Sequence, residues 1–354
     1  MSKKTYNLAL VGFGNVGRAF VGLLRTKHNI LRDQYAIDFR ITGIASRRLG
    51  WLAKPNGFDL DRLCEHGLTT SETSDSSETP ETSQRSIRDW LKVSSADVLF
   101  EATPLNRHTG EPASEHIRAA LEHGAHAISA NKGPVVFHLD ELSQLANSRG
   151  KRFLFESSVM DGTPIFNMFR HCLPAIDLRG FRGVLNSTTN VILSGMERGM
   201  PFEEALRQAQ QIGVAESDPS DDIEGWDAAV KTVALANVLM GARLTPADVE
   251  REGIAHLTGE QVRVARREGK AYKLVCRAMR RHGRVVASVR PELLPLTDAL
   301  ALVDGTSSIV YFETDMFPGL ALTEDHAGLE ATAYGMFSDF IEAVESDRAV
   351  SRPA

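Results

Sequence analysis

The sequence predicts an α/β protein with an N-terminal domain built on a parallel sheet and a second domain of the α+β class. Up to about Glu156, short apolar segments alternate with helical ones, which is typical of a parallel sheet covered by helices. From Asp161 onward, a series of helices is followed by β-type segments, as in an α+β domain. The 354 residues suffice for two domains, each with a core of its own.

The elements of the first domain are predicted from apolar runs and helical periodicity. Strands are expected at 6–11, 39–46, 97–101, 126–130 and 152–156. Helices are expected at 16–25, 111–122 and 139–148. Segment 69–86 has almost no apolar residue, so we expect a solvated loop there between two units of the sheet.

The second domain is expected to begin with helices and to end with strands. Helices are predicted at 164–172, 188–197, 202–211 and 222–240, the last capped near Asp221 or Asp222. After segment 261–267, β-type segments follow at 272–279, 284–290 and 308–313, and an apolar helix at 329–344 completes the pattern. We therefore expect domains at 1–155 and 156–325, with a C-terminal helix at 326–354 that returns to the first domain.

The composition indicates a soluble, intracellular protein rather than one that binds membranes or nucleic acids. A net charge of −6 without a basic stripe argues against a nucleic-acid or anionic membrane surface. No segment approaches the roughly 20 apolar residues of a membrane span, and the N-terminal sequence lacks a signal-peptide pattern. Cys64, Cys172 and Cys276 follow no metal-ligand spacing, so we expect reduced core thiols of a cytosolic protein.

A glycine-rich segment after the first expected strand predicts a dinucleotide-binding, Rossmann-type unit. Gly12 permits a tight turn, Gly14 lets the backbone approach a pyrophosphate, and Gly17 allows close packing of helix on strand. The N-terminus of the following helix would offer free N–H groups to the phosphates. A purely structural turn is the alternative, but the strand before and the helix after supply the context that the motif requires. The candidate cofactor-binding residues here are Gly12, Phe13, Gly14, Asn15, Val16 and Gly17.

The second expected strand ends in Ser46, Arg47 and Arg48. A carboxylate at this place would bind the ribose hydroxyls of NAD, whereas arginines suit a 2′-phosphate. The sequence therefore predicts that NADP(H) is preferred over NAD(H), the alternative being two solvated arginines. Thr103 and Lys132 follow two later strands and are expected at the same carboxyl edge of the sheet, in the cofactor crevice. A solvated loop lysine is the alternative for Lys132.

The helix expected at 222–240 is apolar on nearly every side, yet it carries two charges. Asp227 and Lys231 are four residues apart and share one face. A surface pair would contribute little, and the apolar residues that continue the same face make a surface position awkward. Because a buried ion pair seldom stabilises a fold, we interpret the pair as facing a cleft that receives a polar substrate.

With these residues in place, the sequence resembles homoserine dehydrogenases over nearly its whole length. The matching segments, in order, are VGFGNVGRA, TPLNRHTGEPA, ANKGP, ESSVMDGTPI, GVLNSTTNVIL, GVAESDPSDDIEGWDAAVK and GLEATAYGMFSDF. The resemblance implies hydride transfer between NAD(P) and substrate, interconverting L-homoserine and L-aspartate 4-semialdehyde in threonine, methionine and isoleucine biosynthesis. It also implies a short form without a C-terminal ACT domain, and a homodimer that pairs across the sheet of the second domain.

The resemblance implies roles for individual residues. Lys231 matches the lysine that exchanges a proton with the reacting oxygen, and Lys132 matches a second lysine that contacts cofactor and substrate. Glu216 and Asp227 match the residues that hold the substrate's amino group, and Asp222 matches one that lines the pocket. We expect Asp227 to hold Lys231 in place as well.

Further matches concern the cofactor and an ion. Gly213 and Gly328 match glycines whose backbone approaches the cofactor. A monovalent-cation site for Na⁺ or K⁺ is matched by Glu156 and by the carbonyls of Val159, Asp161 and Thr163. Oxygen ligands suit such an ion, and a plain strand-end turn is the alternative.

Two departures from the family pattern leave alternatives open. Ser187 stands where the family usually has glycine, and Ser308 stands where it usually has asparagine. A dehydrogenase of the same fold acting on another amino or hydroxy acid is therefore one alternative. A non-catalytic NADP-binding sensor is another, although a sensor has no need of a buried lysine. A route through a thiohemiacetal is disfavoured because no cysteine lies in a motif with a base.

Overall fold

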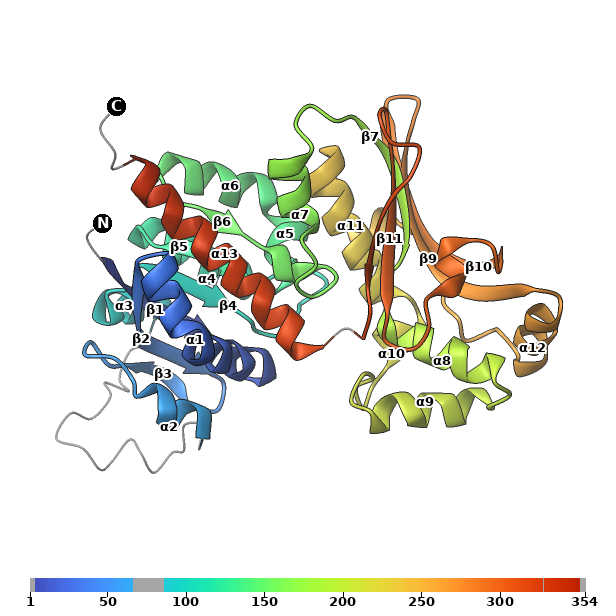
Figure 1. Ribbon diagram of the computed structural model, residues 1–354, viewed down its shortest axis with the longest axis horizontal. Coiled ribbons are helices and arrows are strands. Elements are labelled where there is room, and N and C mark those ends of the chain that lie inside the picture. The colour runs from blue at the N-terminus through green and yellow to red at the C-terminus, as the bar shows by residue number, and fades with distance from the viewer. Residues whose placement is uncertain (1–3, 66–85, 327, 351–354) are drawn as a thin grey trace. The chain divides into compact units, whose positions relative to one another are not determined.

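The computed structural model describes residues 4–326 except 66–85, and residues 328–350 (Figure 1). The chain forms two compact units. Unit 1 runs to Gly162 and resumes at Gly328, and unit 2 comprises the residues between them. Each unit contains a six-stranded sheet with helices, which confirms the predicted α/β class with a Rossmann-type domain and a second, mixed domain. No helix in the described residues is long and apolar enough to cross a membrane.

The sheet of unit 1 has the strand order β3-β2-β1-β4-β5-β6. All neighbours pair in parallel except β3, which folds back antiparallel onto β2. The order reverses between β1 and β4, and in sheets of this kind ligands bind outside the carboxyl ends of the strands at that point. The strands are β1 (Lys4–Val11), β2 (Ile37–Ser46), β3 (Gly50–Ala53), β4 (Val98–Glu101), β5 (His126–Ser129) and β6 (Phe153–Leu154).

Helices cover this sheet, and the C-terminal helix belongs to the same unit. The helices are α1 (Asn15–Gln34), α2 (Leu60–Glu65), α3 (Ile87–Ser94), α4 (Ala113–His123), α5 (Lys132–Phe137), α6 (Leu139–Ser148) and α13 (Leu329–Val350). The last helix lies beside α1, and Phe340 packs edge-on against Phe100 with ring centroids 5.9 Å apart (Figure 1). A Cβ atom on Gly162 would lie 2.0 Å from the carbonyl oxygen of Ala331, so only glycine allows this close approach.

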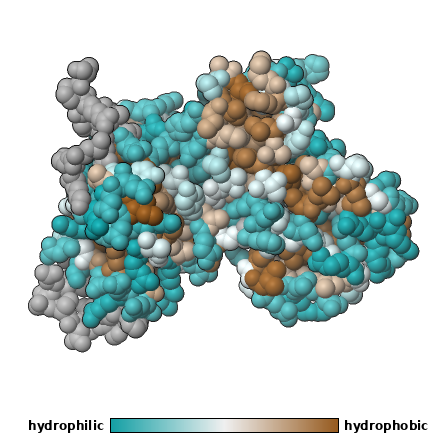
Figure 2. All heavy atoms as spheres, viewed as in Figure 1, coloured by the Kyte–Doolittle hydropathy of each residue, from teal (hydrophilic) through white to brown (hydrophobic). Residues whose placement is uncertain are grey.

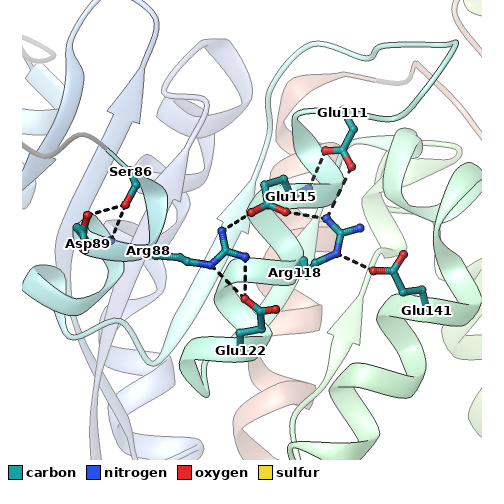
Figure 3. A network of polar contacts seen from close by, with 8 residues as sticks. All are labelled: Ser86, Arg88, Asp89, Glu111, Glu115, Arg118, Glu122 and Glu141. Atoms are coloured by element: carbon teal, nitrogen blue, oxygen red, sulfur yellow. Dashed lines mark hydrogen bonds and ion pairs between the residues drawn. The ribbon is translucent and has the colours of Figure 1, made fainter.

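Ion pairs join α3, α4 and α6 on the surface of unit 1 (Figure 3). Arg118 of α4 donates to Glu141 of α6 at 2.6 Å and to Glu115 at 2.7 Å. Arg88 of α3 contacts both Glu115 and Glu122. Partial burial alone would raise the pKa of Glu115, but hydrogen bonds from the two arginines hold it below its usual value. For Glu141, the hydrogen bond from Arg118 is the main cause of a lowered pKa.

The sheet of unit 2 has the order β12-β11-β7-β9-β10-β8 and is antiparallel except where β10 pairs with β8. Helices α8, α11 and α12 pack against it. In Figure 2, apolar side chains of this unit gather over α7 and α11. The strands are β7 (Leu178–Val184), β8 (Glu250–Arg251), β9 (Lys270–Arg281), β10 (Arg284–Pro295), β11 (Ser308–Thr314) and β12 (Leu320–Glu324). The helices are α7 (Ile165–Asn167), α8 (Ser187–Glu197), α9 (Phe202–Gln211), α10 (Ser220–Ile223), α11 (Trp226–Met240) and α12 (Gly259–Arg267).

Several local predictions were wrong. The helix expected at 222–240 is interrupted, because Gly225 adopts φ 81° and separates α10 from α11. Neither Asp221 nor Asp222 caps the long helix, and Gly225 occupies its N-cap position instead. The helix expected at 164–172 is present as α7 followed by a π-helical turn, whereas the last strand of unit 1 is only Phe153–Leu154. The polar segment lies outside the described residues apart from Ser86, which caps α3 by accepting from the Asp89 amide.

The cysteines also differ from expectation. All three are free, as predicted, but only Cys276 is buried. Cys172 is exposed and Cys64 is partly exposed, so the two are not core thiols. Burial raises the pKa of the Cys276 thiol to about 11. A buried thiol that holds its proton this firmly is a poor nucleophile.

Candidate active site

The turn after β1 has the geometry of a dinucleotide cradle. Gly12 has φ 95°, and a Cβ atom there would lie 2.4 Å from the carbonyl carbon of Ala102. A Cβ atom on Gly17 would lie 2.7 Å from the Gly12 oxygen, so both positions require glycine. Around Gly14 no atom lies within 4 Å of the corresponding point. The turn is therefore packed tightly from below and open where a pyrophosphate would approach.

Helix α1 begins at this opening with uncapped amides. Gly14 is its N-cap residue, no side chain caps the first turn, and no acidic residue lies in that turn. Asn15 and Val16 begin the helix, and the buried ring of Phe13 anchors the turn below it. Free N–H groups and the positive end of a helix of 20 residues suit a phosphate anion. The residues present therefore fit a dinucleotide cofactor.

The two arginines lie in the hairpin turn between β2 and β3. Ser46 pairs with Gly50 across this hairpin, and its hydroxyl accepts a hydrogen bond from the Leu49 amide at 3.1 Å. Arg47 and Arg48 are exposed. Among the described residues neither has a carboxylate partner. The turn thus presents two guanidinium groups and no acidic side chain at the end of β2.

A buried network fixes Thr103 at the end of β4. Glu101 is fully buried, and its Oε1 atom accepts hydrogen bonds from the Thr103 amide and hydroxyl. His116 Nδ1 lies 3.4 Å from the same oxygen. Asn131 Nδ2 donates to the Thr103 carbonyl at 2.9 Å, and Asn131 Oδ1 caps α5, whose first residue is Lys132. The network links Thr103 to the segment that carries Lys132.

Sequence analysis did not identify Glu101, His116 and Asn131. A carboxylate that ends an otherwise apolar strand was a signal for Glu101, because such a group needs partners when buried. The asparagine directly before Lys132 is a common helix cap, which was a signal for Asn131. Nothing in the sequence indicated that His116, on α4, meets Glu101.

In unit 2, the predicted charge pair on α11 is present. Lys231 Nζ lies 3.0 Å from Asp227 Oδ2. Lys231 Nζ also donates to the carbonyl oxygen of Leu185 at 2.7 Å, at the end of β7. The two charged side chains are 18% and 22% exposed, so the pair is largely withdrawn from water yet reachable. A lysine held in this way is suited to exchanging a proton with a bound substrate.

Asn186 connects this pair with Asp222. Its Nδ2 atom donates to Asp222 Oδ1 at 2.6 Å and to Asp227 Oδ2 at 3.0 Å. Burial raises the pKa of Asp222, and the nearby Asp227 carboxylate raises it further. Hydrogen bonds from Asn186 and Thr188 and the charge of Lys231 act in the opposite direction. The site therefore contains two carboxylates and one ammonium group joined by an amide.

Three other predicted residues are described by their local surroundings. The Glu216 carboxylate is exposed, and within the described residues no donor contacts it. Gly213 has φ 78° after α9, and no atom lies within 4 Å of a Cβ position there. Gly328 precedes α13, where its carbonyl oxygen accepts from the Ala331 and Thr332 amides.

The two departures from the family pattern both adjoin the segment that precedes β11. Ser187 begins α8, and its hydroxyl donates to the Thr306 carbonyl at 3.2 Å. Ser308 begins β11 and is buried. The serine at 187 therefore ties the start of α8, directly after Asn186, to the segment before β11.

The predicted cation site falls on a buried turn. Glu156 is 2% exposed, and its amide donates to Asp339 Oδ2 at 2.8 Å. Val159 is buried, whereas the side chain of Asp161, which has φ 50°, accepts from the Thr332 hydroxyl at 2.9 Å. Thr163 follows as the first residue of unit 2. In the described ranges, no group of three or more His, Cys, Asp or Glu side chains could hold a metal ion, so carbonyl oxygens would have to supply most ligands.

Comparisons with known proteins cover both units. Residues 12–156 match the model of the homoserine dehydrogenase NAD binding domain, and residues 164–341 match that of homoserine dehydrogenase. The NAD(+)-dependent homoserine dehydrogenase of Pseudomonas canavaninivorans is 36% identical over 96% of this chain and 97% of its own length. The homoserine dehydrogenase of Methanocaldococcus jannaschii is 35% identical over 97% of this chain and 99% of its own.

Solved structures agree with these matches. A putative homoserine dehydrogenase from Archaeoglobus fulgidus superposes with a TM-score of 0.81 at 32% identity, over 95% of this chain and 98% of that one. A hyperthermophilic archaeal homoserine dehydrogenase mutant in complex with NADPH gives a TM-score of 0.80 at 27% identity, over 99% of both chains.

Proposed function

This chain belongs to the homoserine dehydrogenase family, and from that premise we propose that it interconverts L-homoserine and L-aspartate 4-semialdehyde. The observation that carries the proposal is the Lys231–Asp227 pair on apolar α11, held at the end of β7. The test is turnover of each substrate with NAD or NADP, followed at the nicotinamide absorbance. Activity restricted to another amino or hydroxy acid, or binding of cofactor without turnover, contradicts the proposal.

In the proposed mechanism, Lys231 handles the proton. When bound, the nicotinamide cofactor supplies or accepts the hydride. The Lys231 ammonium donates a proton to the substrate oxygen during reduction, and the neutral Lys231 amine accepts that proton during oxidation. The Leu185 carbonyl and Asp227 hold this ammonium from two sides, which fixes its position for the proton exchange.

The carboxylates are proposed to hold the amino group of the substrate. Asp227 and Glu216 attract the ammonium of the amino acid, and Asp222 shapes the pocket around it. Lys132, at the first position of α5, contacts both substrate and cofactor in this proposal. Orienting the zwitterionic end in this manner places the reacting carbon, and such orientation contributes much of a catalysed rate.

We propose that NADP(H) binds more tightly than NAD(H). The end of β2 carries Arg47 and Arg48 and no carboxylate, and the described residues leave both guanidinium groups without an acidic partner. The proposed remaining cofactor contacts are Thr103, Gly213, Gly328 and the fingerprint residues. One relative is named as NAD(+)-dependent and one similar structure is described in complex with NADPH, so the family includes both cofactors.

We also propose a bound Na⁺ or K⁺ ion at the Glu156 turn. The side chains of Glu156 and Asp339 are both buried, the Glu156 amide donates to Asp339 Oδ2, and a cation would reduce the cost of burying such charges. The proposed ligands are Glu156 and the carbonyls of Val159, Asp161 and Thr163. The test compares activity and thermal stability in NaCl, KCl and tetramethylammonium chloride. Equal values in all three salts contradict the site.

A homodimer is proposed across the sheet of unit 2. The strand β10 exposes Leu293 (42%) and Val286 (44%), which offer apolar surface on this sheet for a second copy to cover. Leu293→Glu should shift the mass measured by light scattering toward the monomer, whereas Ile212→Glu, at an exposed position after α9, should not.

We place the enzyme in the cytoplasm, in threonine, methionine and isoleucine biosynthesis. The three free cysteines support a reducing compartment.

A further inference from the structure

Asn186 lies at the junction of β7 and α8 and uses both ends of its amide. It is 4% exposed. Its Oδ1 atom accepts hydrogen bonds from the Thr189 amide and hydroxyl, both at 2.9 Å, and so caps α8. Its Nδ2 atom donates to Asp222 and to Asp227. A backbone N–H can only donate, so the oxygen must face Thr189 and the NH₂ group must face the two carboxylates.

The position of this amide matters because two carboxylates lie close together. Two carboxylates that accept from the same amide nitrogen repel each other when both are charged, and burial strengthens the repulsion. Both N–H groups of Asn186 are occupied, one for each carboxylate, and a charge-assisted hydrogen bond favours the ionised form of its acceptor. Since the first turn of α8 holds the oxygen of this amide, the NH₂ group has a fixed position and also fixes the separation of the Asp222 and Asp227 carboxylates.

We propose that Asn186 is a positioning residue for the reaction, which holds Asp222 and Asp227 side by side as charged groups and keeps Asp227 aligned with Lys231. The inference rests on the proposed function, because it assigns Asp227 and Lys231 to substrate binding and proton transfer. Asn186 acts through these two residues and needs no contact with the substrate. Because its Oδ1 atom also caps α8, the amide cannot rotate its NH₂ group away from the two carboxylates.

The pKa of Asp222 should change in a predictable direction when the Asn186 amide is removed. The titratable groups that face Asp222 are Asp227 and Lys231 on α11, and Cys276 of β9 lies beside the same helix. Burial and Asp227 already raise the pKa of Asp222, while Asn186 opposes the rise. Removing the amide therefore raises this pKa further, and the acid limb of the pH profile of kcat/KM moves to higher pH.

Two variants separate positioning from helix capping. Asn186→Ser keeps a hydroxyl that caps α8 but is too short to reach both carboxylates. Asn186→Asp keeps the size and the cap but replaces the donor with a third carboxylate. The control is Thr258→Ala, which removes the cap of α12 in the same unit and leaves the site untouched. We expect the serine variant to lose about ten- to a hundredfold in kcat/KM, mainly through a raised KM for homoserine.

The expected pattern differs from that of a structural defect. Both Asn186 variants should shift the acid limb upward, with the larger loss in Asn186→Asp, while Thr258→Ala should lower Tm and leave KM and the pH profile unchanged. If Asn186→Ser does not fold, Asn186→Asp decides the matter alone. Variants with kcat/KM within twofold of wild type and an unmoved acid limb overturn the inference.

A second readout does not depend on turnover. In protein with ¹³C-labelled aspartate carboxyls, the Asp222 resonance, assigned by its loss in Asp222→Asn, should titrate at higher pH in Asn186→Ser than in wild type. An unchanged titration contradicts the role of Asn186. Wild-type protein that fails to oxidise homoserine contradicts the proposed function instead, so the two failures are distinguishable.

Discussion

Replacing Arg47 and Arg48 together by alanine should remove a preference for NADP and leave NAD binding nearly unchanged. Both side chains project from the turn between β2 and β3, and neither has a positive φ that alanine would strain. The turn is held by Ser46, whose hydroxyl accepts from the Leu49 amide, and by the β2–β3 pairing. The variant should therefore fold normally and lose only charge and donors.

The magnitude follows from the exposure of the two arginines. A hydrogen bond to a charged group contributes about 1.5–3 kcal/mol, and an exposed ion pair contributes about 0.2–1 kcal/mol. The exposed turn puts the arginines toward the lower end. At about 1 kcal/mol for each arginine, two such contacts contribute about 2 kcal/mol, which at about 1.4 kcal/mol per factor of ten is a roughly thirtyfold increase in Kd for NADP. Because the Debye length is about 10 Å at 0.1 M salt, raised salt should erode the same preference.

The assay is isothermal titration of both cofactors to wild type and variant at two salt concentrations. Dissociation constants are the quantity to compare, because tight binding and fast turnover need not coincide. Arg149→Ala, at an exposed arginine after α6, serves as the control for loss of positive charge in unit 1. Equal constants for NAD and NADP in the wild type refute the reasoning. An unchanged ratio in the double variant places the phosphate contact elsewhere.

Three further predictions concern the proton donor, the substrate ammonium and the surface network. Lys231→Ala should lower turnover by about 10²–10⁴-fold with cofactor binding and Tm nearly unchanged, and turnover within tenfold of wild type removes it from the chemistry. Glu216→Gln and Asp227→Asn should raise KM for homoserine; if both saturate like wild type, the ammonium assignment is wrong. Arg118→Ala should lower Tm at neutral pH but less near pH 3, measured by thermal melts. Glu141 has a lowered pKa, so its contribution is complete above its usual value of 4.5 and is lost as pH falls through the folded value.

The sequence predicted those features that depend on residues close together in the chain. The fingerprint at 12–17 combines a strand, a turn and a helix in one segment, and the structure contains all three. Helix α9 was predicted with its observed bounds, Phe202–Gln211, because its apolar residues recur at helical spacing. The Asp227–Lys231 pair was predictable for the same reason, since its members are one helical turn apart.

Features that depend on distant residues were not predictable in the same way. Gly225 interrupts the helix because it adopts φ 81°, and a Cβ atom there would lie 3.3 Å from the Val289 side chain of β10. A glycine within an apolar helical pattern does not reveal such a contact. Glu101 and His116 are on different elements, and the partners of Asn186 lie 36 and 41 residues further along the chain. These contacts exist only in the folded chain.

The junction between β7 and α8 accounts for the arrangement of the site in unit 2. Two consecutive residues bind all three charged groups, since the Leu185 carbonyl accepts from Lys231 and the Asn186 amide donates to Asp222 and Asp227. A strand end supplies a carbonyl without a sheet partner, and a helix cap supplies a side chain of fixed direction. A proton donor and its neighbouring carboxylates are therefore held by backbone that the sheet and the helix both fix. The next residue, Ser187, ties this junction to Thr306, so a change at that position would act on all three groups together.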